Sequence, residues 1–215
     1  PSAKNYKNTA MPVYRGVTEG QYVVIPYSPT SGAVFKWFKD EFCKEEIEYS
    51  KNNNINIYDY LCSIAKDVPA GANGVIMFPY FAGCIQPEPI PDARGVIFGL
   101  GLDADKKTII KSILESVGYM IRENIEMLKS MGIDIKKLHF FGGGSKNPYW
   151  NQIIADILGI ELVLLEQSEC ASQGAAILAA VSLGWASDIQ EAQKSNPVSG
   201  IIKPDIKNKH IYDEM

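Results

Sequence analysis

The chain has 215 residues, enough for one large α/β domain with a sizeable core but too few for two full domains. Its 46% hydrophobic and 21% charged residues are ordinary for a folded protein and argue against disorder or a fibrous repeat. A net charge of −4 without any Lys/Arg run argues against nucleic acid as a partner. No apolar run approaches the roughly 20 residues that span a bilayer, so we expect no membrane partner and a cytoplasmic protein.

The first part of the chain predicts two helices between short strands. Apolar residues recur at helical spacing in two stretches, whereas residues 1–20 are polar and irregular. The predicted elements are a strand over 22–25, a helix that begins after the turn at 28–32, a second helix over about 57–65 and a buried strand over 75–78.

The middle of the chain combines a proline-rich arm with a long helix. Residues 79–95 contain four prolines and no strand or helix period, which indicates an ordered surface arm. A strand at 96–98 follows, and the apolar spacing over 106–131 predicts a long amphipathic helix that Gly132 ends.

The last part alternates strands and helices. We predict a strand over 138–141, a helix to Leu158, a strand over 162–165 and a helix over about 171–183. This alternation indicates an α/β fold whose sheet carries helices on both faces, in which ligands bind beyond the carboxyl ends of strands.

A glycine run between the strand 138–141 and the next helix is the most informative motif. Gly142, Gly143 and Gly144 let the backbone approach a ligand closely, Asn147 can cap the helix, and Pro148 suits the first helical position. Free N–H groups at a helix start favour an anion, so a phosphate-bearing ligand fits. The alternative is a merely structural tight turn, and the residues alone favour neither.

Other known site types fit less well. A P-loop needs Gly-Lys followed by Ser or Thr, and the chain has no Gly-Lys pair. A dinucleotide fingerprint would use Glu166, but Asn147 occupies the place of its third glycine, so this interpretation ranks second. Four cysteines without C-x-x-C spacing and only two histidines predict no metal ligands.

Several motifs in order resemble the FGGY family of carbohydrate kinases, especially its xylulokinase-like branch. The similar segments are the glycine run with its helix and strand (142–166), the run Ala171-Ser172-Gln173-Gly174-Ala175-Ala176, and, upstream, 78–83, 91–100 and 112–115. An ordered set of motifs over roughly residues 13–194 is far more specific than one glycine run.

The resemblance implies an actin-like, ribonuclease-H-like ATPase fold with a mixed sheet, which closes over ATP and Mg²⁺ against an amino-terminal sugar-binding domain. It implies that residues 1–215 are the carboxy-terminal nucleotide-binding domain of a longer kinase, which transfers the γ-phosphoryl group of ATP to a sugar or polyol. The nucleotide-binding residues that it implies are Gly32, Lys36, Gly142, Gly143, Gly144 and Asn147.

The resemblance implies no catalytic residue in this chain, since the family's aspartate base lies in the amino-terminal domain and nothing here matches it. We therefore expect the isolated chain to bind ATP or ADP without phosphorylating a sugar. The ending His210–Met215 is expected to begin a last helix that breaks off before it buries an apolar face. A homodimer stays open, as do two other classes: a NAD-binding oxidoreductase module and a non-catalytic actin-like regulatory domain.

Overall fold

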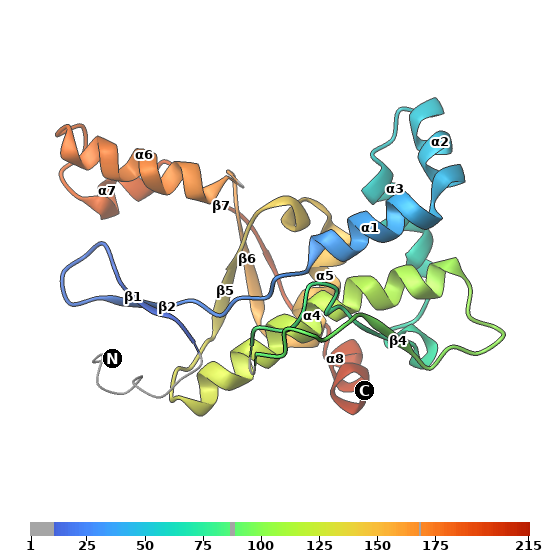
Figure 1. Cartoon of the computed structure of the whole chain (residues 1–215). Helices are drawn as coiled ribbons and strands as arrows, with labels where there is room; N and C mark the ends of the chain where they lie inside the picture. The colour runs from blue at the N-terminus through green and yellow to red at the C-terminus, as the bar shows by residue number, and fades with distance from the viewer. Residues whose placement is uncertain (1–10, 87–88, 168) are drawn as a thin grey trace.

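The computed structural model describes residues 11–86, 89–167 and 169–215. Figure 1 shows one long helix, α4, crossing the molecule, with α1 to α3 toward one end and α6 and α7 projecting at the other. In chain order the helices are α1 (Gly32–Phe42), α2 (Lys44–Asn52), α3 (Ile57–Ile64), α4 (Lys106–Ser130), α5 (Pro148–Leu158), α6 (Cys170–Ser182), α7 (Ile189–Gln193) and α8 (Ile206–Glu214). The strands are β1 (Val13–Arg15), β2 (Tyr22–Val24), β3 (Ile76–Phe78), β4 (Val96–Phe98), β5 (Lys137–Phe140), β6 (Glu161–Leu165) and β7 (Val198–Ile202).

Helix α4 organises the core, as its apolar spacing predicts. The Asp105 side chain caps it by accepting a hydrogen bond from the Thr108 N–H at 2.9 Å, and its apolar face is fully buried at Ile113 and Leu114. Against α5, a Cβ on Gly118 would lie only 2.6 Å from Cδ1 of Ile157. The missing side chain at Gly118 therefore lets the two helices pack closely.

The strands confirm the α/β class but form three separate sheets among the described residues. Strand β5 pairs parallel with β6, and β6 pairs antiparallel with β7, which puts Leu138 opposite Leu162 and Leu162 opposite Ile202. Leu162 is fully buried in the core that α4 and α5 share, whereas His139 and Ile201 are exposed. The pairs β1–β2 and β3–β4 form antiparallel two-stranded sheets.

Four features were not predicted, one of which is the short helix α7. Strand β1 lies in the stretch expected to be irregular, because three residues are too few to show an alternation. The first helical region breaks at Cys43, whose φ of −118° and ψ of 41° separate α1 from α2. Strand β7 is formed by Val198–Ile202, which carries a glycine in a polar surrounding.

The expected last helix is present, but its expected start and the expectation that it breaks off before burying a side chain are wrong. Helix α8 begins at Ile206, four residues earlier than the expected start, and the Asp205 side chain caps it through the Lys207 N–H. Its Tyr212 is only 2% exposed and packs into the main core. One aromatic side chain therefore anchors a helix whose other residues are mostly polar.

The proline-rich arm is ordered in its described part, as predicted. Its backbone pairs Cys84 with Ile90, and it packs onto the segment before α1, where the Tyr27 N–H donates to Oε1 of Gln86 at 2.5 Å. Thr30 donates through its hydroxyl to the carbonyl of Pro79. The arm is therefore held to the body at its start and near its middle.

Candidate functional site

The glycine loop makes a sharp exit from β5. Gly142 has φ +90° and ψ −170°, a conformation open only to glycine, and one 3₁₀ turn over Gly143–Lys146 follows. The Ser145 hydroxyl and N–H both donate to the Gly142 carbonyl, at 2.8 and 3.2 Å. The loop is thus held by its own hydrogen bonds, with no side chain of its own at three successive positions.

Asn147 joins the loop to α5 as the sequence predicts. Its Oδ1 accepts a hydrogen bond from the Trp150 N–H at 3.1 Å, and Pro148 occupies the first helical turn. The start of an 11-residue helix, with its positive dipole end, therefore lies directly behind the glycine loop.

A cavity of about 910 Å³ opens beside this loop. Four of the predicted nucleotide-binding residues line it: Gly32 at the start of α1, Gly143 and Gly144 on the loop, and Asn147. A Cβ on Gly143 would meet nothing within 4 Å, so this glycine faces open space rather than packing. Two segments about 110 residues apart in sequence are therefore brought to one cavity.

The cavity has two chemically different parts. Many of its apolar residues come from the side of α4 and from β5, whereas most of its polar groups lie near the glycine loop and the starts of α1 and α3. The apolar residues of this part are Val117, Met120, Ile121, Ile125, Leu128, Ile135, Leu138 and Phe140. The polar side chains are those of Ser28, Ser31, Asn56, Asp59, Asn124, Lys146 and Asn147. Apolar walls with a few polar groups are typical of small-molecule sites.

The two remaining predicted residues do not line the cavity. Gly142 lies just outside it and sets the direction of the backbone. Lys36 lies on the exposed side of α1, where its Nζ pairs with Oδ2 of Asp40 at 2.5 Å, a hydrogen bond that raises the pKa of Lys36. The structure therefore does not bring Lys36 to the other five residues.

Two charged residues of the cavity were missed. Lys146 belongs to the glycine loop itself, so a search for a cation within the loop would have found it. Asp59 comes from the first turn of α3, and its Oδ1 accepts a hydrogen bond from Nδ2 of Asn147 at 2.6 Å. No local pattern could have indicated a contact between residues 88 apart in sequence.

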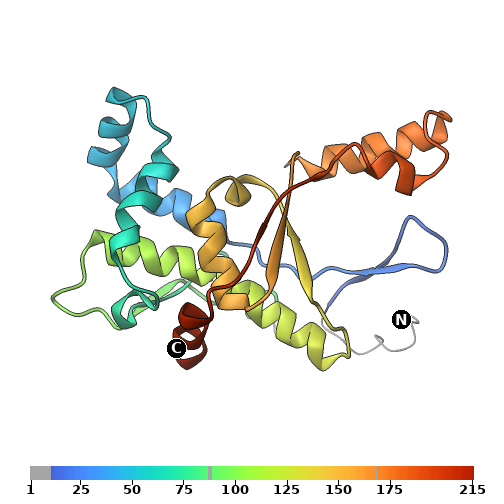
Figure 2. The same ribbon diagram turned by 180° about the vertical axis from the view of Figure 1, so that it is seen from behind.

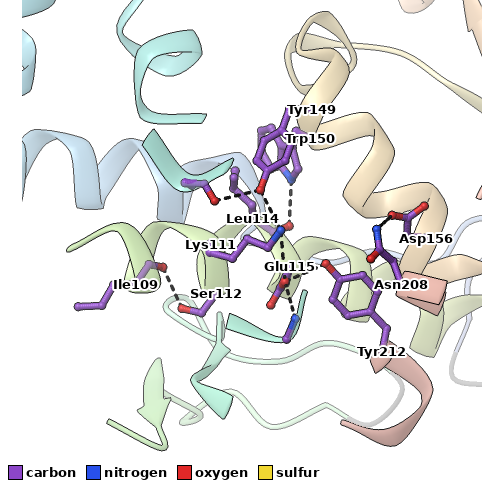
Figure 3. Close-up of polar contacts among 12 residues, drawn as sticks. Ile109, Lys111, Ser112, Leu114, Glu115, Tyr149, Trp150, Asp156, Asn208 and Tyr212 are labelled. Carbon is purple, nitrogen blue, oxygen red and sulfur yellow. Dashed lines mark hydrogen bonds and ion pairs between the residues drawn. The ribbon is translucent and has the colours of Figure 1, made fainter. Parts of the chain in front are cut away.

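Side-chain hydrogen bonds connect the start of α5 to α4 (Figure 3). The Trp150 indole donates to the Leu114 carbonyl at 2.9 Å, and the Lys111 ammonium donates to the Tyr149 hydroxyl at 2.9 Å. That hydroxyl in turn donates to the Ala65 carbonyl at 3.0 Å. These bonds fix the helix start that carries the glycine loop, which preorganises the site.

The described residues do not fit a magnesium site. No group of three His, Cys, Asp or Glu side chains among them could hold a metal ion. Among the described residues, Asp59 is the one carboxylate that lines the cavity, and it accepts a hydrogen bond from Asn147. We therefore assign no residue of this chain to Mg²⁺.

Comparison with known proteins identifies the family. Residues 3–183 match the model of the FGGY family of carbohydrate kinases, C-terminal domain. The chain belongs to the FGGY family of carbohydrate kinases. A gluconokinase from Bacillus licheniformis is 34% identical over 169 residues, 78% of this chain and 33% of its own length. A xylulose kinase from Staphylococcus epidermidis is 26% identical over 194 residues, which are 90% of this chain and 37% of the relative.

Solved structures of FGGY kinases share the fold. The xylulose kinase from Rhodospirillum rubrum superposes with a TM-score of 0.82 at 24% identity, over 95% of this chain and 40% of that chain. The predicted actin-like, ribonuclease-H-like fold is thereby confirmed. This FGGY chain spans about a third of the length of the curated relatives it matches. None of the helices within 11–86, 89–167 and 169–215 combines the length and hydropathy that crossing a membrane requires.

Proposed function

We propose that residues 1–215 are the carboxy-terminal nucleotide-binding domain of an ATP-dependent sugar or polyol kinase. ATP binds with its phosphates at the glycine loop, against the start of α5, and extends toward the start of α1. The observation that carries this proposal is Gly143, which lines the cavity and leaves open space where a side chain would stand. Family membership supports the reaction class.

The charges around the loop suit a polyphosphate. The start of α5 offers the N–H of Tyr149 and the positive end of the helix dipole, and Lys146 adds a cation from the preceding turn of the glycine loop. The Plasmodium falciparum glycerol kinase, solved with ADP, shares the fold with a TM-score of 0.70. Such likeness favours an adenine nucleotide over other anions.

This domain positions the nucleotide and leaves the remaining chemistry to another part of the enzyme. Phosphoryl transfer needs in-line placement, charge stabilisation and a group that accepts the hydroxyl proton. Asp105 and Asp156 act as structural acceptors: Asp105 caps α4, and Asp156 accepts from Asn208 and from the Asp205 N–H. We therefore name no catalytic residue and expect the base, the sugar site and the Mg²⁺ environment outside this chain.

Exposed apolar surface supports a partner domain. Helix α6 is rich in apolar residues yet buries none of those described, and Trp185 just after it is 79% exposed. Figures 1 and 2 both show α6 and α7 projecting from the body. Apolar surface of this kind usually belongs to an interface, and we assign it to contact with the rest of the kinase. A homodimer of this chain stays a prediction.

Calorimetry on the purified chain tests the proposal. We expect ATP and ADP to bind weakly, with a Kd on the order of 1 mM, because one wall of the cleft supplies the contacts. NAD⁺ tests the dinucleotide alternative and should bind no better than ADP. Incubation of the chain with ATP and gluconate, xylulose or glycerol should give no phosphorylated sugar. NAD⁺ binding tighter than ADP, or measurable sugar turnover, would contradict the proposal.

A further inference from the structure

Both ends of the Asn147 amide are held. Its Oδ1 accepts from the Trp150 N–H, so Nδ2 is left as the donor end, and Nδ2 donates to Oδ1 of Asp59 at 2.6 Å. An amide group turned by 180° would lose both hydrogen bonds. The side chain of Asn147 therefore has one orientation, which Asp59 and the helix start define together.

The position of Asp59 is fixed by the capped start of helix α3. The Asn56 side chain caps α3 by accepting from the N–H groups of Tyr58 and Asp59, at 2.9 and 3.3 Å. The Tyr58 ring packs edge-on against Phe35, with ring centroids 5.3 Å apart, and Phe35 is fully buried. The start of α3 is thus packed on α1. From there the Asp59 carboxylate contacts Asn147 at the end of the glycine loop, and both residues line the cavity.

We propose that Asp59 is a positioning residue of the nucleotide site, acting through the amide of Asn147. This inference rests on the proposed function and adds a residue from α3 to it. Nδ2 of Asn147 carries two hydrogens, and Asp59 takes one of them, so the second stays available to a ligand in a fixed direction. Without Asp59 the amide is free to turn, and part of the binding energy is lost in ordering it.

A rival role for Asp59 makes the opposite prediction. A carboxylate near a helix start is attracted by the helix dipole, and it can occupy the place of an incoming phosphate. In that case Asp59 competes with the nucleotide, and its removal would tighten binding. The sign of the change in affinity decides between the two roles.

The experiment measures the ADP affinity of the chain by NMR titration for the wild type, Asp59→Ala and Asp59→Asn. We expect Asp59→Ala to weaken binding about three- to tenfold, the range of a lost hydrogen bond. Asp59→Asn keeps an acceptor oxygen for Nδ2 and should stay within about twofold of the wild type. Asp67→Ala, an exposed aspartate of the following turn that lies outside the cavity, is the matched control and should change nothing.

A double-mutant cycle with Asn147→Ala tests whether Asp59 acts through the amide. In the Asn147→Ala background, Asp59→Ala should have no further effect on ADP affinity, because its target is gone. Additive losses, tighter binding by Asp59→Ala, or no loss in that variant would each overturn the inference. Failure of the proposed function looks different, since the wild-type chain itself would then not bind ADP. Melting temperatures of all variants separate these outcomes from misfolding.

Discussion

Two neighbouring glycines of the loop have different physical roles. Gly142 has a φ of +90°, which an L-residue adopts only with strain, while Gly143 does not have a positive φ and faces open space. Glycine is therefore needed at position 142 because of the backbone conformation. At position 143 it is needed to leave room for a ligand in the cavity. The sequence shows three equivalent glycines, and only the dihedral angles separate them.

Replacing the two glycines should give opposite results. Gly143→Val should raise the Kd for ADP at least tenfold, roughly 1.4 kcal/mol, with the melting temperature nearly unchanged, because its side chain enters the proposed phosphate site. Gly142→Val, the matched control, should lower the stability of the protein by about 1 kcal/mol or more through backbone strain. Calorimetry measures the ADP affinity, and thermal melts measure the stability, so the two effects are separated. Wild-type ADP affinity in Gly143→Val would make the loop a structural turn.

Local patterns predicted the parts of the site that one segment forms. The Asn147 cap and the Pro148 start of α5 follow from residues a few positions apart, and both are confirmed. The Asp59–Asn147 contact depends on how α3 packs against α1, which no local pattern encodes. The implied role of Lys36 came only from the family resemblance, and its pairing with Asp40 leaves that role a prediction.

At the scale of elements, α4 carries a buried charged network that ties α8 and α5 to it. Figure 3 shows Glu115 between Lys111 and Tyr212. Oε1 of Glu115 accepts from the Tyr212 hydroxyl at 2.8 Å and from the Gly71 N–H at 3.0 Å, and lies 3.8 Å from the Lys111 ammonium. Burial raises the pKa of Glu115 to about 7, against the opposing effects of Lys111 and these hydrogen bonds.

This raised pKa predicts that stability falls as the pH rises from about 5 to 7.5. The folded protein keeps a proton on Glu115 that the unfolded chain releases near the ordinary pKa of 4.5. The stabilisation that this proton gives the folded state is therefore complete below pH 4.5, and it is lost as the pH rises to about 7. The loss should amount to at most about 3 kcal/mol. Urea unfolding of the wild type and Glu115→Gln across this range measures it, and the variant should show a flatter dependence.

The control for this dependence is Glu126→Gln, on the exposed side of the same helix. It should keep the pH dependence of the wild type, because Glu126 takes no part in the buried network. An identical slope in Glu115→Gln and the wild type would show that Glu115 does not retain its proton in the folded state.

For the whole molecule, periodicity predicted the long helices better than it predicted the sheet. Helix α4 presents seven turns of apolar spacing, and its structure agrees with the predicted 106–131 within one residue. Strands of three to five residues carry little pattern, so β1 and β7 and the division into three sheets depended on tertiary packing. Helix α8 was misjudged because a single buried tyrosine, rather than an apolar face, holds it.

The measurement that tests the central claim most directly is a backbone NMR titration of the chain with ADP. The account predicts saturable shifts of the amide signals of Gly143, Gly144 and Asn147, with Gly32 moving at the same ADP concentration, since these residues line one cavity. The exposed face of the sheet at His139 and Ile201 should stay unchanged. Shifts confined to regions away from the glycine loop, or no saturable shift at all, would contradict the assignment of the nucleotide to this site.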